Sequence, residues 1–520
     1  MNKFLLFIWT IAFCRRQLLL TSWWQIKEYR LDRFWVFLKT KEGQRKTEIF
    51  LLLAKLLLLA AAIFFKPLSY FYPAILLAET AKLSYELLSR QLKRPKITFR
   101  SLIFLFNSFL PVIIFLSQRE KLNLSLLIFF DLLGFFILPA SAFLTDIPLK
   151  IVLKFKRRRV VSALNQYNPQ VIAITGSYAK SSTKHLLFEL LKDYAPTVKT
   201  PASYNTELGI MKAIKSLNRQ TKYFLCEMGA YKKGEIKALC QLVKPDFALI
   251  TGIAPQHLAL FGSKENLLKT KYEIAQSLKP KGVLFVNATH SSTKPIIQRA
   301  QKDRLKIITY ALKDNQQKAD FLGSIIKKSE NETVFKINSR QDQIKFTTNK
   351  VFPQDLENLT GALAVALTLK VPQKHLKKVV ANLPEIDSGI KIKIISPCIA
   401  LLDDSYNSNP VGFEAALGIL AKSKGFKILV SDGIKELGKN EFTIHKNLGK
   451  KSKFADLILT TSPSLLKSFQ AGLGKDKEKI HLVRPNIKLE ELKELIKTPA
   501  TILLEGRLPS SLVKTISKLN

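Results

Sequence analysis

The first 150 residues contain apolar stretches that approach the length of a membrane-spanning helix, which is about 20 apolar residues. Four stretches are candidates: residues 49–65, 67–88, 102–116 and 124–144. The second is the weakest because three charged residues, Glu79, Lys82 and Glu86, interrupt it. We therefore predict a membrane-anchoring helical region over residues 1–150, with about four transmembrane helices.

A large excess of basic residues bears on what the chain binds and on its orientation. The chain carries 82 Lys and Arg against 40 Asp and Glu, a formal net charge of +42, which predicts an anionic partner, either nucleic acid or a lipid surface. No zinc-finger or RNA-binding signature is present, so we expect membrane lipids and no nucleic acid. If all four stretches cross, three basic stretches share one side: residues 41–46, 90–100 and 150–159. This predicts a multi-pass protein of the cell (inner/plasma) membrane, with its large C-terminal part in the cytoplasm.

Two features of the helical region each allow two interpretations. Residues 1–14 resemble the apolar part of a signal peptide, but Arg15 and Arg16 follow directly and no small-residue cleavage site is present. An uncleaved anchor or an interfacial helix is expected there. Asp131 lies in the middle of a predicted span, where it either faces the helix bundle or marks an ion or substrate path.

From about residue 171 the pattern changes to alternating strands and helices. Short apolar runs such as VIAIT, FALITGI and GVLFVNA, separated by helical stretches, are typical of a buried parallel sheet. Residues 320–351 are predicted to form antiparallel hairpins, and the alternation restarts after residue 399. We therefore expect an α/β fold, with membrane helices followed by a parallel-sheet central domain (residues 160–390) and a smaller Rossmann-like C-terminal domain (residues 391–520).

The strongest local motif is ITGSYAKSSTK, residues 174–184. A strand ending at Thr175, a tight turn at Gly176 and a helix from Lys180 would form a phosphate-binding loop, or P-loop, with Ser181 as a magnesium ligand. Ala179 stands where such loops usually have glycine, which costs about 1 kcal/mol if the position requires a positive φ. Taken alone, the motif also allows an ordinary strand–turn–helix.

Six further stretches follow the P-loop in an order that is typical of one family. They are SYNTELG (203–209), CEMGAYKKGEI (226–236), HLALFGSKENLLKTKYEI (257–274), LFVNA (284–288), DDSYNSNPVGFEAAL (403–417) and SDGIKELG (431–438), the last with His445. Together they resemble the Mur ligases, closest to the branch that adds the D-Ala-D-Ala dipeptide to peptidoglycan precursors. The resemblance implies an ATP-dependent ligase in which a substrate carboxylate attacks the γ-phosphate and an amine then opens the acyl-phosphate.

The resemblance also implies roles for individual residues. Lys180 would stabilise the transferring phosphoryl group. Ser181 and Glu227 would hold the first of two Mg²⁺ ions and His257 the second. Lys271 matches a lysine that the family modifies with CO₂ to a carbamate, which requires a neutral amine and then offers magnesium a hard oxygen ligand.

Other residues match the family's nucleotide and substrate contacts. The implied nucleotide-binding set is Gly176, Ser177, Lys180, Ser181, Ser182, Asn287, Asp404, Tyr406, Asn407 and Asn409. Asn205 and Thr206 would lie near the reacting carboxylate. Each match has a structural alternative; Asp404 and Asn407, for instance, could form an Asx-turn before the helix that starts at Pro410.

The chain departs from the family pattern in several places. A usual His-Asn pair is replaced within residues 354–358, Ile390 follows Gly389 where an arginine is common, and Glu505 opens a segment that usually begins with lysine. Membrane helices stand where the family has its UDP-binding domain. We therefore expect a lipid-linked or UDP-linked cell-wall precursor as acceptor and an amino acid or dipeptide as amine. The alternative is a degenerate, membrane-tethered nucleotide-binding scaffold.

Overall fold

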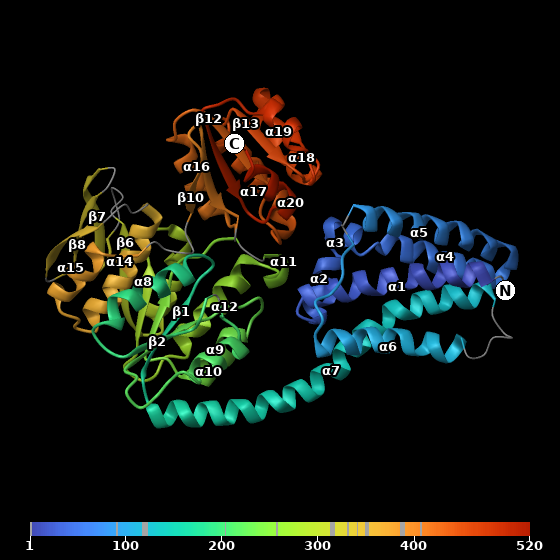
Figure 1. Cartoon of the computed structure of the whole chain (residues 1–520). Helices are drawn as coiled ribbons and strands as arrows, with labels where there is room; N and C mark the ends of the chain where they lie inside the picture. Colours follow the sequence, from blue (N-terminus) through green and yellow to red (C-terminus); the bar gives the residue numbers. More distant parts are fainter. Residues whose placement is uncertain are drawn as a thin grey trace. The chain divides into compact units, whose positions relative to one another are not determined.

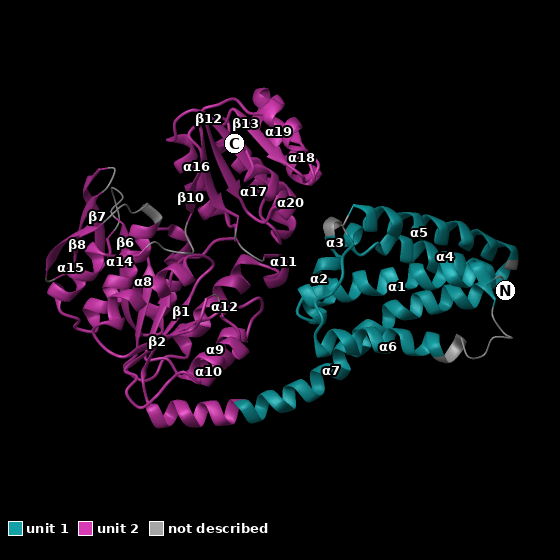
Figure 2. Ribbon diagram, in the orientation of Figure 1, with its two compact units in different colours: residues 1–156 teal, residues 157–520 magenta. Residues whose placement is uncertain are grey.

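The computed structural model describes most of the chain. The described residues are 3–89, 92–116, 123–202, 204–255, 258–312, 318–329, 332–340, 342–348, 353–384, 390–405 and 408–519. They form two compact units, residues 1–156 and 157–520 (Figure 2). The boundary falls within one long helix, and each unit is described by itself.

The first unit, called here the helical unit, is a bundle of α-helices (Figure 1). Its helices are α1 (Lys3–Ile26), α2 (Leu31–Leu38), α3 (Lys41–Lys46), α4 (Ile49–Phe64), α5 (Tyr72–Leu88), α6 (Phe99–Leu116) and α7 (Leu124–Tyr167), the last continuing into the second unit. In the described part of the chain, α1 and α7 are long and apolar enough to cross a membrane, while α4 and α6 are shorter apolar helices. The predicted number of crossings thus stays a prediction.

Helix α1 is longer and more deeply packed than the first 14 residues indicated. It runs for 24 residues, through Arg15 and Arg16, before it ends at Ile26. Trp9 and Phe13 belong to a buried apolar cluster with residues of α4, α5, α6 and α7. The indole nitrogen of Trp9 also donates a hydrogen bond to the backbone oxygen of Leu127, at 3.2 Å. Helix α1 is therefore an integral helix of this bundle.

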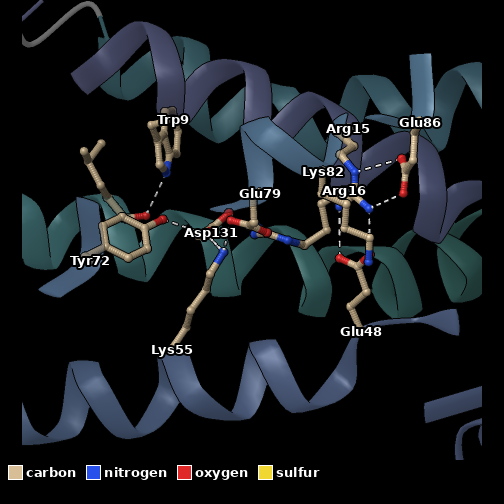
Figure 3. Close-up of polar contacts among 11 residues, drawn as sticks. Trp9, Arg15, Arg16, Glu48, Lys55, Tyr72, Glu79, Lys82, Glu86 and Asp131 are labelled. Carbon is tan, nitrogen blue, oxygen red and sulfur yellow. Dashed lines mark hydrogen bonds and ion pairs between the residues drawn. The ribbon is translucent and has the colours of Figure 1, made fainter. Parts of the chain in front are cut away.

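A buried charged network joins four helices of the helical unit (Figure 3). Arg16 of α1 pairs with Glu79 of α5 and with Asp131 of α7. Lys55 of α4 pairs with the same two carboxylates, at 2.7 Å and 2.5 Å, and the Tyr72 hydroxyl donates to Asp131 at 2.7 Å. Two cations thus neutralise two anions. Asp131 faces the bundle and is paired there, which agrees with the bundle-facing interpretation of this residue.

A second charged group lies beside the first and repeats its balance (Figure 3). Arg15 pairs with Glu48 and Glu86, each at 2.6 Å, and Lys82 also pairs with Glu48 at 2.6 Å. The two consecutive arginines of α1 therefore bind four carboxylates contributed by other parts of the bundle. Arg15 and Arg16 are almost wholly buried, and buried charges are stable only when paired, so their contacts fix α1 against its neighbours.

The described residues of the second unit form two sheets, the larger of which has nine strands in the order β2-β3-β1-β4-β5-β6-β7-β8-β9. The strands are β1 (Gln170–Thr175), β2 (Thr197–Lys199), β3 (Tyr223–Glu227), β4 (Phe247–Ile250), β5 (Val283–Asn287), β6 (Lys306–Leu312), β7 (Phe321–Lys328), β8 (Thr333–Asn338) and β9 (Gln343–Thr348). Neighbours from β2 to β7 pair in parallel, whereas β7, β8 and β9 are antiparallel. The parallel sheet and the predicted hairpins are both confirmed.

Helices alternate with these strands, as buried parallel strands require. They are α8 (Lys180–Lys192), α9 (Glu207–Ile214), α10 (Glu235–Val243), α11 (Leu258–Phe261), α12 (Lys264–Gln276), α13 (Lys294–Lys302), α14 (Pro353–Thr368) and α15 (Gln373–Ala381). Apolar residues of α8, α14 and α15 pack with the strands into one core. This packing fixes the start of α8 directly after β1.

The smaller sheet has six strands in the order β10-β11-β15-β12-β13-β14. The strands are β10 (Lys391–Ser396), β11 (Ile399–Asp404), β12 (Phe426–Ser431), β13 (Leu457–Thr460), β14 (Ile480–Leu482) and β15 (Ala500–Glu505). Within the described strands of this sheet, β10 pairs with β11 antiparallel and the other neighbours pair in parallel. The accompanying helices are α16 (Pro410–Ala421), α17 (Glu441–Lys451), α18 (Pro463–Leu473), α19 (Leu489–Leu495) and α20 (Ser510–Ile516). The expected α/β fold with a second, smaller sheet is confirmed, whereas the predicted domain bounds stay a prediction.

Candidate active site

The P-loop has the predicted strand–turn–helix form. Strand β1 ends at Thr175 and helix α8 begins at Lys180. Gly176 has φ +156°, and a Cβ at this position would lie 2.1 Å from the Thr251 hydroxyl oxygen. Only glycine fits this approach of the loop to the end of β4, so the turn depends on Gly176.

Ala179 adopts a left-handed conformation immediately before α8, with φ 61° and ψ 3°. This is the conformation in which glycine has no steric penalty and an L-residue has one of about 1–2 kcal/mol. The sequence predicts a cost for alanine only if this position requires a positive φ, and the structure shows that it does. The alanine introduces strain at the point where the P-loop enters its helix.

Two polar groups of the P-loop fit a phosphate ligand. The Lys180 ammonium donates to the backbone oxygens of Gly176 and Ser177, at 3.0 Å and 3.3 Å, so it lies over the loop. Burial lowers its pKa, partly offset by Glu227. The buried Ser177 hydroxyl has no hydrogen-bond partner among the described residues. A cation and a free donor in this loop suit phosphate oxygens.

Two of the predicted magnesium ligands, Ser181 and Glu227, lie together at the end of β3 and the start of α8. The Ser181 hydroxyl donates to Glu227 Oε2 at 2.8 Å, and the Asn205 amide donates to Glu227 Oε1 at 3.1 Å. Glu227 is 1% exposed. Burial alone would raise its pKa, but the ammonium groups of Lys184 and Lys180 outweigh that effect and lower it. An ionised carboxylate beside a hydroxyl is a fitting donor pair for Mg²⁺.

Lys271 projects from α12 into the same pocket as the P-loop. The pocket is lined by Gly176, Ser177, Lys180, Asn205, Gly229, Ala230, Tyr231, Phe261, Leu267 and Lys271. Burial, and then the positive charge of Lys180, lower the pKa of Lys271 to about 7. Near neutral pH, Lys271 is therefore a neutral amine in a large fraction of the molecules. The neutral amine is the form that reacts with CO₂.

Several predicted site residues lie outside the P-loop pocket or outside the described residues. His257, Tyr406 and Asn407 fall outside the described residues. Asn287 is buried at the end of β5, where its amide nitrogen donates to the Thr251 carbonyl at 2.6 Å and to Glu357. Adenine recognition by Asn287 therefore stays a prediction.

In the C-terminal domain, Asn409 has a clear structural role. Its side chain accepts hydrogen bonds from the backbone nitrogens of Val411 and Gly412 at 3.1 Å and 3.0 Å, which caps α16. The expected Asx interaction before Pro410 is thus made by Asn409. Ser182 and Thr206 lie at the starts of α8 and α9, where they flank the P-loop and the Asn205 turn.

Asp404 lies beside a second carboxyl group that sequence reasoning did not connect with it. It pairs with Glu505 across the parallel strands β11 and β15. Burial raises the pKa of Asp404 to about 6, and burial together with Asp404 raises that of Glu505. The Ser408 hydroxyl donates to Glu505 at 2.6 Å. This pair therefore retains a proton to higher pH than an ordinary carboxylate.

His445 and Lys184 are two further buried groups. His445 Nε2 accepts from the Ile434 backbone nitrogen at 2.9 Å, and burial lowers its pKa to about 4. It is a neutral residue that supports the turn after β12. Lys184 pairs with Glu227 at 2.9 Å. Lys184 lies one turn after Ser181 on α8, so the two residues share one face of the helix. This spacing could have predicted that Lys184 also contacts Glu227.

Comparison with known proteins agrees with this geometry. Residues 174–366 match the Mur ligase middle domain. This segment of the chain is similar to the middle domain of the Mur ligases. The match includes the P-loop, Glu227, Lys271 and Asn287. It confirms the resemblance given by the motifs.

Curated Mur ligases and solved Mur ligase structures extend the likeness beyond this segment. The UDP-N-acetylmuramoyl-tripeptide--D-alanyl-D-alanine ligase of Buchnera aphidicola (subsp. Baizongia pistaciae) is 30% identical over 287 residues, 55% of this chain and 61% of that protein. The same enzyme of Escherichia coli K12 is 25% identical over 362 residues, 68% of this chain and 77% of that protein.

Among solved structures, MurF from Acinetobacter baumannii has a TM-score of 0.62 at 24% identity and covers 70% of this chain and 79% of its own. MurF from Thermotoga maritima in complex with ADP has a TM-score of 0.60 at 21% identity and covers 71% and 84%. These likenesses establish the Mur ligase fold. The chain spans about three fifths of the Buchnera relative's length.

Proposed function

We propose that this protein is an ATP-dependent ligase that forms an amide bond through an acyl-phosphate in peptidoglycan synthesis. The observation that carries the proposal is the convergence of Lys180, Ser181, Glu227 and Lys271 at one P-loop. The named relatives that share this middle domain are D-alanyl-D-alanine-adding ligases.

The site residues suit the difficulty of the first step, in which a carboxylate anion must approach a polyanion. Bound Mg²⁺-ATP would supply the phosphoryl group and most of the charge neutralisation. Lys180 would turn from the loop carbonyls to the β- and γ-phosphates, while Ser181 and Glu227 would ligate the metal. A substrate carboxylate oxygen attacks the γ-phosphorus and ADP leaves. The amine then attacks the acyl carbon, phosphate leaves, and the nitrogen loses a proton.

We further propose that Lys271 takes up CO₂ as a carbamate. Its lowered pKa, about 7, makes the neutral amine available, and the resulting carbamate would replace a cation beside Lys180 by an anion. That exchange removes the like-charge repulsion in the pocket and provides oxygen ligands for the second metal. His257 is proposed as another ligand of that metal.

We also propose that the helical unit is a multi-pass membrane anchor. Two of its helices have the length and composition of a membrane span. On α4, Leu57, Ile63 and Phe64 are 71%, 75% and 92% exposed, which suits contact with lipid and would be unfavourable in water. The acceptor would then be a lipid-linked precursor. Ligation measured with lipid-linked and UDP-linked acceptors tests this, since a clear preference for the UDP-linked compound contradicts it.

Catalysis itself is tested by phosphate release from the detergent-solubilised protein. The assay contains Mg²⁺-ATP, bicarbonate, a precursor carboxylate and candidate amines, and compares the wild type with Lys180→Ala. We expect release that requires both acceptor and amine and that falls at least a hundredfold in the variant, a loss of about 3 kcal/mol in transition-state stabilisation. Equal rates in both proteins would contradict the proposal.

A second function, a nucleotide-binding scaffold without turnover, is favoured by two observations. Ala179 occupies a strained left-handed position in the P-loop, and Glu505 places a buried carboxyl group where the family pattern described above implies a lysine. A scaffold would bind Mg²⁺-ATP yet release no phosphate with any acceptor. The Ala179→Gly variant separates the two functions further, because relief of strain should increase turnover only in an enzyme.

A further inference from the structure

Lys184 is a buried cation that the proposed reaction does not use. It lies on α8 and is 3% exposed. Its ammonium donates to Glu227 Oε2 at 2.9 Å, to the Thr200 hydroxyl at 3.4 Å and to the backbone oxygen of Ala202. An ammonium has three donors, and here each has an acceptor. The position of Lys184 is therefore fully determined by its contacts.

Glu227 is held by the same group of contacts. Its Oε2 accepts from Ser181 as well as from Lys184, its Oε1 accepts from Asn205, and its backbone nitrogen donates to the Thr200 hydroxyl at 3.1 Å. Thr200 thus contacts both members of the Lys184–Glu227 pair. The carboxylate is fixed in direction before any metal binds.

Lys184 differs in this respect from the other lysine of the P-loop. Lys180 lies over loop carbonyl groups, from which it can turn to a phosphate. Lys184 is directed away from the loop, toward β3 and the segment after β2. It therefore belongs to the support of the metal ligand Glu227.

We propose that Lys184 is a positioning residue that acts as a built-in counter-cation for Glu227. Its ammonium, at 2.9 Å from Glu227 Oε2, holds the buried carboxylate directed at Ser181 while the site lacks Mg²⁺. The inference rests on the proposed function, which assigns Glu227 to magnesium. Beyond that function, Lys184 stabilises the metal-free site. When Mg²⁺ binds, the metal and Lys184 share the Glu227 carboxylate.

This arrangement predicts opposite effects on the metal-free and metal-bound protein. Without Lys184, Glu227 would be buried without its paired cation, so the metal-free protein loses stability. Mg²⁺ would then face no competing charge on Oε2, so it should bind about tenfold more tightly. A residue needed only for packing would lower stability without strengthening metal binding.

The experiment is thermal unfolding of the full chain with and without Mg²⁺, in the absence of nucleotide, for the wild type and Lys184→Met. Lys192→Met is the matched control, because Lys192 lies on the same helix and pairs with Glu189 but is 40% exposed. We expect Lys184→Met to melt lower without metal and to gain more from Mg²⁺ than the wild type, while Lys192→Met changes neither value. An unchanged or smaller gain from Mg²⁺ in Lys184→Met overturns the inference.

A double variant keeps the test decisive if Lys184→Met does not fold. In Lys184→Met/Glu227→Gln both charges are removed together, so this protein should be more stable than Glu227→Gln alone, which leaves the ammonium buried without its carboxylate. The opposite order of stability overturns the inference. Failure of the wild type to bind Mg²⁺-ATP would count against the proposed function alone, because these measurements use no nucleotide.

Discussion

Replacing Ala179 by glycine should stabilise the protein, which is unusual for a change from alanine to glycine at the start of a helix. Ala179 has φ 61° and ψ 3°. Relief of the left-handed strain gains about 1–2 kcal/mol. Glycine also makes the unfolded chain more flexible, and this lowers the free energy of unfolding by about 0.4–1 kcal/mol. The net stabilisation expected for Ala179→Gly is therefore about 0.5–1 kcal/mol.

Thermal unfolding of the full chain measures this difference. For a unit as large as residues 157–520, we expect the midpoint to rise by about 1–2 °C. Ala238→Gly is the matched control, because Ala238 is an exposed residue inside α10 and should lose about 1 kcal/mol as glycine. If both variants melt lower by similar amounts, the strain argument is refuted. If only Ala179→Gly melts higher, the P-loop has the described backbone.

Three further predictions concern charged groups. Asp131→Asn should destabilise the helical unit by about 3–5 kcal/mol in thermal unfolding, because two buried cations lose a shared anion. The control Asp146→Asn changes a partly exposed ion pair and should cost under about 1 kcal/mol. Equal losses in the two variants would argue against a buried network. Because the pKa of Lys271 is lowered to about 7, its neutral fraction rises from about a tenth at pH 6 to about nine-tenths at pH 8. Carbamate detected by ¹³C NMR with labelled bicarbonate should rise over that range and be absent from Lys271→Met, and a flat profile contradicts the assignment. The folded pKa of Asp404 is raised to about 6 beside Glu505, so the folded protein binds more protons than the unfolded chain and loses stability as pH rises from about 4 through 6. Glu505→Gln should therefore raise the melting temperature at pH 8 but not at pH 4, whereas an equal effect at both values would exclude a shared proton.

The parts of the fold that follow local pattern could be predicted from the sequence. The apolar runs that become β1, β4 and β5 are buried parallel strands, and the P-loop lies between β1 and α8 as expected. Glycine, lysine and serine at fixed spacing determine this loop through local backbone geometry. Even the strain at Ala179 could be stated as a condition before the backbone was known.

The parts that depend on pairing between distant segments could not be predicted. Arg15 and Arg16 looked like the end of an apolar segment, because their carboxylate partners lie on other helices far along the chain. Asp404 and Glu505 meet only because β11 and β15 are neighbours in the smaller sheet. Lys184 was visible in the motif, yet only the position of β3 shows that it pairs with Glu227.

Binding of Mg²⁺-ATP at the P-loop is the claim on which the proposed reaction depends. Isothermal titration of the full chain with a non-hydrolysable ATP analogue, with and without Mg²⁺, tests it most directly. We expect one site per chain that requires Mg²⁺, with binding at least tenfold weaker in both Lys180→Ala and Glu227→Gln, a loss of about 1.4 kcal/mol or more. Binding that is unaffected by metal and by both substitutions would contradict the assignment of this site.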